Sequence, residues 1–150
     1  SAAPEWDTLN ALITGTDYFR ESLNLAGHET LKFVFDVPGG RTQGVLVRHR
    51  PSTLEDFGGS WVIIETPFAN VEEVSLADVI SKTELFGIGG LGQLGPFVTL
   101  RNSIDLKSVE LGSEDAGVGA AFLMEVVKQQ RELANVSDSF EGHFTGVDAF

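Results

Sequence analysis

The chain has 150 residues, of which 42% are hydrophobic, so it is long enough and apolar enough to form one domain with a well-filled core. Its formal charge of −12 disfavours nucleic acid and anionic membranes as partners, and the absence of cysteine excludes disulfides and thiolate metal sites. Because this composition suits a reducing compartment and includes no run of ~20 apolar residues, we expect a cytoplasmic protein that does not enter the membrane.

The N-terminal segment predicts a short helix from Pro4 to about Ile13. Proline suits the first helical turn, where its missing N–H group is not needed, and Glu5 and Asp7 are favourable near the positive end of the helix dipole. The apolar stripe of this segment then ends at Gly15, which is a typical stop signal.

A β-hairpin and a central strand follow. Apolar and polar residues alternate over 31–37, and the Pro-Gly-Gly sequence at 38–40 suits a tight turn because glycine adopts positive φ easily. The return strand covers about 42–50. After a loop at 52–59, the run 60–68 contains four successive apolar residues, which predicts a central strand covered on both faces.

The second half of the chain predicts two more helices with a strand between them. Residues 74–85 suit a helix with Ser75 as its N-cap. Its apolar face would carry Leu76, Val79 and Ile80. A glycine-rich stretch over 86–92 leads from this helix to a strand at 97–101, and Gly95-Pro96 separates the two.

The last helix is predicted to begin after Ser113, whose side chain can cap it, and to run to about Asn135. We expect residues 1–135 to form a single domain and residues 136–150 to form a flexible tail, because the tail is polar and contains glycine. The complete order is α-β-β-β-α-β(β)-α. Hairpin-linked strands of this kind predict an α+β fold, with an antiparallel sheet of about five strands and helices packed on it.

The chain matches none of the sequence templates for catalysis that we compared with it. Residues 87–92 read G-x-G-x-x-G, but a dinucleotide-binding loop needs a helix directly after it, and Gly95-Pro96 prevents that helix. The three histidines are far apart and form no metal-binding pattern. Asp36 and Glu65 are the carboxylates nearest to apolar runs, and ordinary strand positions explain both. We therefore predict no catalytic, cofactor-binding or metal-binding residues.

Apolar surface is the feature of the sequence that points to a partner. Eleven phenylalanines and two tryptophans are a large aromatic content for one small domain. If helices cover only one face of the sheet, apolar residues of the other face must contact another chain. The candidate partner-binding residues lie on the hairpin and on the central strand: Phe33, Phe35, Val45, Val47, Trp61 and Ile63. Helices on both faces would bury the same residues, and the sequence is compatible with either arrangement.

The order of the elements resembles that of type III secretion chaperones and the related YbjN-like proteins. The local similarities are the Leu-Phe-Gly sequence at 85–87, the apolar strand at 95–102 and the long helix after Ser113. The resemblance covers about residues 5–135. It implies a small acidic protein, usually a homodimer, that holds an extended segment of a partner protein and does no chemistry.

We therefore expect a non-catalytic, chaperone-like or adaptor-like module that binds a protein partner and needs no cofactor. Two alternatives remain open. A small hydrolase-type enzyme could use carboxylates in a pocket beside the sheet, which would require two such groups with different pKa values in one cavity. A regulatory subunit could instead act through its C-terminal tail, residues 136–150.

Overall fold

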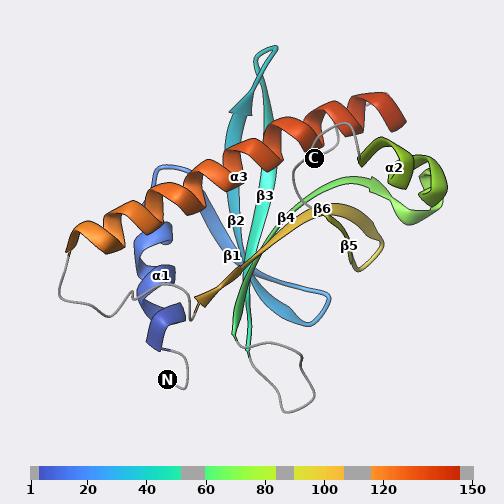
Figure 1. Ribbon diagram of the computed structural model, residues 1–150. Helices are drawn as coiled ribbons and strands as arrows, with labels where there is room; N and C mark the ends of the chain where they lie inside the picture. The colour runs from blue at the N-terminus through green and yellow to red at the C-terminus, as the bar shows by residue number, and fades with distance from the viewer. Residues whose placement is uncertain (1–3, 52–59, 84–89, 107–115, 146–150) are drawn as a thin grey trace.

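The computed structural model describes residues 4–51, 60–83, 90–106 and 116–145. Within these ranges the chain forms an antiparallel sheet, three α-helices and one short 3-10 helix (Figure 1). The elements in chain order are α1 (Pro4–Thr14), β1 (Phe19–Leu25), β2 (His28–Val37), β3 (Arg41–Arg50), β4 (Trp61–Asn70), the 3-10 helix η1 (Val71–Glu73), α2 (Leu76–Thr83), β5 (Gly90–Leu94), β6 (Phe97–Asp105) and α3 (Ala116–Phe144).

The six described strands form one sheet in the order β1-β2-β3-β4-β6-β5, and every neighbouring pair is antiparallel. The predicted α+β fold class is therefore confirmed. The predicted hairpin is present as β2 and β3, and its turn contains Gly39 and Gly40, both with positive φ. The predicted central strand is β4, in which eight successive residues are buried.

Strand β1 was not predicted from the sequence, and it raises the number of strands to six. It is an edge strand whose residues are exposed or only half-buried, so it lacks a strong apolar pattern. A two-residue turn connects it to β2, because Leu25 pairs with His28. Both turn residues, Ala26 and Gly27, have positive φ, as the favoured hairpin turns require. Alanine is uncommon in that conformation, which explains why the turn is hard to recognise in the sequence.

The remaining elements agree with the prediction in type but differ in extent. Helix α2 begins at Leu76, and the backbone N–H of Asp78 donates to the Ser75 hydroxyl, as expected of a cap. Val79 is buried, whereas the side chains of Leu76 and Ile80, expected on the same face, are exposed. The sequence-predicted loop at 52–59, the end of the second helix after Thr83, the first part of the glycine-rich stretch and the Ser113 cap lie outside the described residues.

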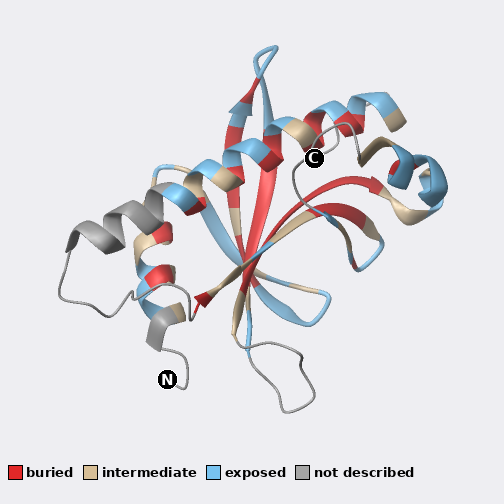
Figure 2. Ribbon diagram, in the orientation of Figure 1, coloured by how far each residue is buried: buried red, intermediate tan, exposed pale blue. Residues whose placement is uncertain are grey.

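Helix α3 lies across one face of the sheet and creates the hydrophobic core (Figures 1 and 2). We call this side the covered face. The strand residues on the covered face point toward α3 and are almost fully buried: Phe33, Phe35, Val45, Val47, Val62, Ile64 and Phe68. Leu133 and Phe140 of α3 pack against them. Side chains alternate along a strand, so the residues between these face the opposite side, which we call the open face.

The described C-terminal residues correct the predicted boundary at residue 135. Helix α3 continues to Phe144, so much of the segment 136–150, expected as a flexible tail, is helical. Phe140 is only 2% exposed, and its ring contacts that of Phe68 edge to face at 5.3 Å between centroids. The polar residues that suggested a tail are also bonded. Arg41 forms an ion pair with Asp138 at 2.5 Å, and the Ser137 hydroxyl donates to the Pro67 carbonyl at 3.1 Å.

Replacing Phe140 with alanine should destabilise the whole domain, because it removes a buried ring from between α3 and β4. We expect a loss of about 3–5 kcal/mol in the free energy of unfolding, measured by urea denaturation. Ser139→Ala is the matched control, because Ser139 is exposed on the same helical turn. Equal stability of the two variants would show that the last turns of α3 do not contribute to the core.

Helix α1 contacts α3, and its Leu9 and Ile13 are fully buried in the core. Trp6 stacks on His49 of β3, with ring centroids 5.4 Å apart and planes inclined by 13°. Burial lowers the pKa of His49 below its ordinary value of about 6.5, although the nearby Asp7 carboxylate partly opposes this shift. The folded protein therefore favours the neutral imidazole at this contact.

This shift predicts that stability depends on pH through His49. The unfolded chain takes up a proton near pH 6.5, whereas folded His49 does so only at lower pH, so stability is full above that value and declines as the pH falls below it. We expect the difference in Tm between pH 8 and pH 5.5 to be smaller in His49→Phe, which keeps an aromatic ring against Trp6 but cannot titrate. An unchanged difference would mean that the His49 shift does not contribute.

Candidate binding groove on the open face

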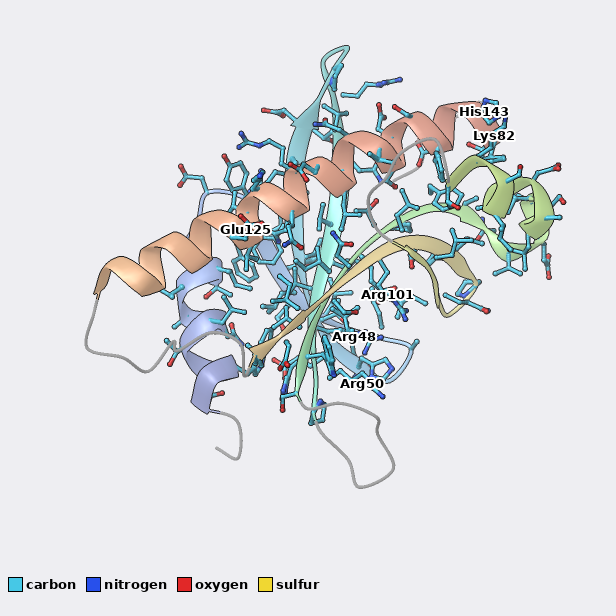
Figure 3. The ribbon with its side chains drawn as sticks, in the orientation of Figure 1. Arg48, Arg50, Lys82, Arg101, Glu125 and His143 are labelled. Carbon is cyan, nitrogen blue, oxygen red and sulfur yellow. The ribbon has the colours of Figure 1, made fainter. Side chains whose placement is uncertain are left out.

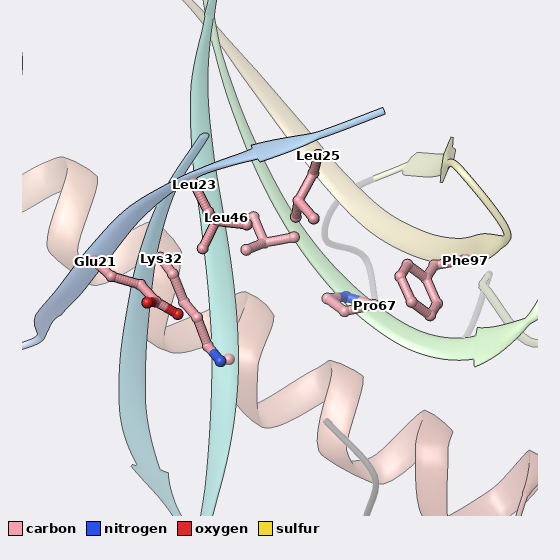
Figure 4. Close-up of a pocket in the computed structure, with 8 residues that line it drawn as sticks. Glu21, Leu23, Leu25, Lys32, Leu46, Pro67 and Phe97 are labelled. Carbon is pink, nitrogen blue, oxygen red and sulfur yellow. The ribbon is translucent and has the colours of Figure 1, made fainter. Parts of the chain in front are cut away.

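An apolar groove of about 260 Å³ lies on the open face of the sheet (Figure 4). Four strands contribute to its apolar lining, which consists of Leu23, Leu25, Leu46, Pro67 and Phe97. Glu21, Lys32 and Gly44 complete it. Gly44 has no side chain, which leaves space in the middle of β3. None of the described residues of α3 lines this groove, so it is separate from the core.

The groove exists because the sheet is strongly twisted. The turn between β1 and β2 and the turn between β5 and β6 lie at diagonally opposite corners of the sheet. Nevertheless, a Cβ placed on Gly95 in the second turn would lie only 4.0 Å from the Cβ of Ala26 in the first. A twisted sheet is saddle-shaped, so two such corners bend toward the same face. Leu25 and Phe97 are thereby brought to opposite sides of one groove.

One end of the groove is charged. Glu21 and Lys32 are cross-strand partners on β1 and β2, and Figure 4 shows their side chains next to each other. Neither side chain forms an ion pair or a hydrogen bond with a described residue. This end of the groove therefore offers one charge of each sign to a ligand and favours neither on its own.

A buried carboxylate lies beside the groove, in the middle of the open face. Glu65 on β4 is only 1% exposed and pairs with Leu46 of the groove across β3 and β4. Its Oε1 accepts from the Nε of Arg48 at 3.3 Å. Its Oε2 accepts from the hydroxyl of Thr99 at 2.8 Å and from the Nε and Nη2 of Arg101 at 3.0 and 2.7 Å.

These four hydrogen bonds define the chemistry of Glu65. Burying a charge is costly unless it is paired and hydrogen-bonded, and both oxygens of Glu65 are occupied by donors. Its two cationic partners together carry one more charge than it does, so the cluster has a net charge of about +1 in a protein with a formal charge of −12.

The position of Arg101 depends on a glycine of the neighbouring strand. A Cβ on Gly92 of β5 would lie 2.5 Å from the Nε of Arg101 and 2.8 Å from the Thr99 hydroxyl, which is closer than real Cβ atoms come. Gly92 is the last glycine of the G-x-G-x-x-G sequence. In the structure it lies in strand β5, and because it has no side chain, the Arg101 side chain has room to reach Glu65.

Replacing Gly92 with alanine should therefore displace Arg101 from Glu65. We expect the free energy of unfolding to fall by about 1–3 kcal/mol, because the buried Glu65 carboxylate loses the two hydrogen bonds that Arg101 donates to it. Gly90→Ala is the matched control on the same strand. Its Cβ would meet only the Arg101 carbonyl, at an ordinary 3.9 Å. Chemical denaturation of both variants measures the difference, and equal stabilities would contradict this role of Gly92.

The structure divides the six residues predicted to bind a partner between the two faces. Phe33, Phe35, Val45 and Val47 are at most 1% exposed and lie on the covered face beneath α3. The expectation that they form a docking surface is corrected, because they form the core of this chain. The other two, Trp61 and Ile63, lie on the open face of the strand that carries Glu65. Trp61 is half-buried there, and Ile63 is 4% exposed.

A second hollow, of about 530 Å³, lies where β4 ends and the turn between β5 and β6 begins. It is lined by Asn70, Val71, Glu72, Glu73, Gln93 and Pro96. Four of these six residues have polar side chains, and the two glutamates are exposed. Within the described ranges, no three acidic or histidine side chains are placed to hold a metal ion. The apolar groove is therefore the stronger candidate for a binding site.

Comparisons with protein-family models, curated proteins and solved structures returned no match to this chain. In the part of the chain that the structure describes, none of the helices is both long enough and apolar enough to cross a lipid bilayer.

Proposed function

We propose that the protein is a binding module that holds an extended segment of a partner protein in the groove of its open face. The observation that supports this most directly is the groove itself, in which five apolar side chains from four strands surround one hollow. Apolar surface that the described helices leave uncovered is typical of a docking site. An extended segment suits it, because alternate side chains of such a segment point to the same side.

The volume of the groove favours side chains of a protein segment over a cofactor. Sites for drug-sized ligands usually enclose about 300–1,000 Å³, and the 260 Å³ found here falls below this range. A hollow of this size suits a small number of apolar side chains. The resemblance to type III secretion chaperones, with the homodimer that it implies, is compatible with this proposal and remains part of it.

The two alternative functions have less support. For an enzyme with carboxylates in a pocket beside the sheet, the best-placed carboxylate is Glu65, and its oxygens accept four hydrogen bonds from Arg48, Thr99 and Arg101. For a regulatory subunit that acts through residues 136–150, most of that segment is part of α3 and contributes Phe140 to the core. Both observations favour the groove on the open face as the binding surface of the protein.

Selection from a library of random twelve-residue peptides tests the proposal. The double variant Leu23→Gln/Leu25→Gln should lose binding of the selected peptides at least about tenfold, because each buried leucine contributes roughly 1.5–3 kcal/mol. The matched control is Ser22→Gln/Asn24→Gln, which changes exposed residues of the same strand that point to the opposite face. Fluorescence anisotropy with labelled peptides measures both. Failure to obtain any peptide that distinguishes the two variants would contradict the proposal.

A further inference from the structure

Several basic residues of the chain lie on the open face. The sequence contains only ten lysines and arginines. Four of them lie on this face, at Lys32, Arg48, Arg50 and Arg101, as the alternation of β2, β3 and β6 places them. Figure 3 shows Arg48, Arg50 and Arg101 in one region of the molecule, away from α3. The same alternation also places Glu21, Asp36, Glu65 and Asp105 on this face, so an excess of positive charge is found only locally, where Arg48 and Arg101 share Glu65.

Pairing with Glu65 does not use the full hydrogen-bonding capacity of these cations. An arginine has five N–H donors. Arg48 donates to Glu65 only through its Nε, whereas Arg101 uses its Nε and Nη2, and its Nη2 also donates to the Gln93 carbonyl at 3.3 Å. Among the described residues, no acceptor bonds to the Nη groups of Arg48 or to the Nη1 of Arg101. The Arg101 side chain is still 26% exposed, so part of its guanidinium can be reached from outside.

These donors lie next to the apolar groove. Lys32 pairs with Leu46 of the groove, and Leu46 pairs in turn with Glu65. Arg101 lies opposite Glu65, on the strand that begins with Phe97 of the groove. Four residues of an extended strand span about 13 Å, which is the approximate backbone distance from Phe97 to Arg101. A ligand in the groove can therefore reach the cations within a few residues of its own length.

We propose that the segment held in the groove carries a carboxylate, which binds to the free N–H groups of Arg101 and Arg48, while its apolar side chains fill the groove. This inference rests on the proposed function and specifies the chemistry of the partner: an extended apolar segment with Asp or Glu about four residues from its main apolar anchor. Planar guanidinium groups match carboxylates in geometry as well as in charge.

The overall charge of −12 does not oppose this choice. At physiological ionic strength, charges further away than about 8 Å are largely screened, so the groups in direct contact decide the preference of a site. Those groups are two arginines and one buried carboxylate, with a net charge of about +1. A basic segment would be repelled by Arg48 and Arg101, and the carboxylate between them, Glu65, already accepts hydrogen bonds from both.

The test uses synthetic peptides chosen from the twelve-residue library. For each peptide that depends on Leu23 and Leu25, the acidic residue is replaced by its amide, Asp by Asn or Glu by Gln, and binding is measured by fluorescence anisotropy. We expect the amide form to bind about tenfold more weakly, because a charge-assisted hydrogen bond is lost. This change leaves the protein unaltered, so the result does not depend on the folding of any variant.

Variants of the protein supply the complementary measurement. Arg101→Gln should weaken binding of the acidic peptide about tenfold and leave binding of its amide form unchanged. Arg101→Lys, which keeps the charge, should retain most of the affinity for the acidic peptide. Glu65→Gln removes the competing charge and should strengthen binding of the acidic peptide. Circular dichroism confirms that each variant is folded before its binding is compared.

The possible outcomes separate this inference from the proposed function. Two outcomes would overturn the inference that the bound segment carries a carboxylate and leave the groove as a docking site. In the first, peptides that need the groove bind equally well in the amide form. In the second, the selected peptides are enriched in lysine and arginine. If no peptide needs the groove, both proposals fail. Two further probes identify a different occupant and would likewise overturn the inference. These are saturable binding of decanoate that Leu23→Gln/Leu25→Gln abolishes, and self-association of the chain that the same variant abolishes.

Discussion

The twist of the six-stranded sheet is the constraint on which the rest of the structure depends. A saddle-shaped sheet is concave along one diagonal on each of its faces. Helix α3 lies obliquely across one face and completes the core there (Figure 1). On the other face, the same twist brings Ala26 close to Gly95 and encloses the apolar groove. The core and the candidate site are therefore two results of a single geometric property, and flattening the sheet would weaken both.

The two faces of the central strand β4 carry different kinds of side chain. On its covered side, Ile64 and Phe68 pack beneath α3. On its open side, Glu65 is buried and is compensated by cations from the strands on either side. A hydrophobic residue could fill that position without any partner, and buried ion pairs contribute little to stability compared with such a replacement. The charged cluster is therefore expected to add little stability relative to an apolar replacement, which agrees with the role in recognition that we propose for it.

Much of the fold could be predicted from the sequence, because its strongest signals are local. Alternation and the Pro-Gly-Gly turn define β2 and β3, and a continuous apolar run defines β4. Strand β1 was missed because its residues are mostly polar and its turn contains Ala26 at positive φ. The end of α3 was missed because its polar residues are stabilised by Arg41 and Pro67, which lie far away in the sequence. The site was harder to predict still. The hairpin has one mainly apolar face, and the sequence alone does not show whether a helix of the same chain or a partner covers it. The three partners of Glu65 are 17 to 36 residues distant from it.

The close approach of Gly92 to Arg101 has an evolutionary consequence. The guanidinium occupies the space that any side chain at position 92 would need, so neither position can change freely while the other is kept. Descendants of this sequence should retain the pair together or lose it together, with a larger residue at 92 accompanied by a shorter one at 101. Such paired changes in an alignment would trace the history of the cationic cluster through the lineage.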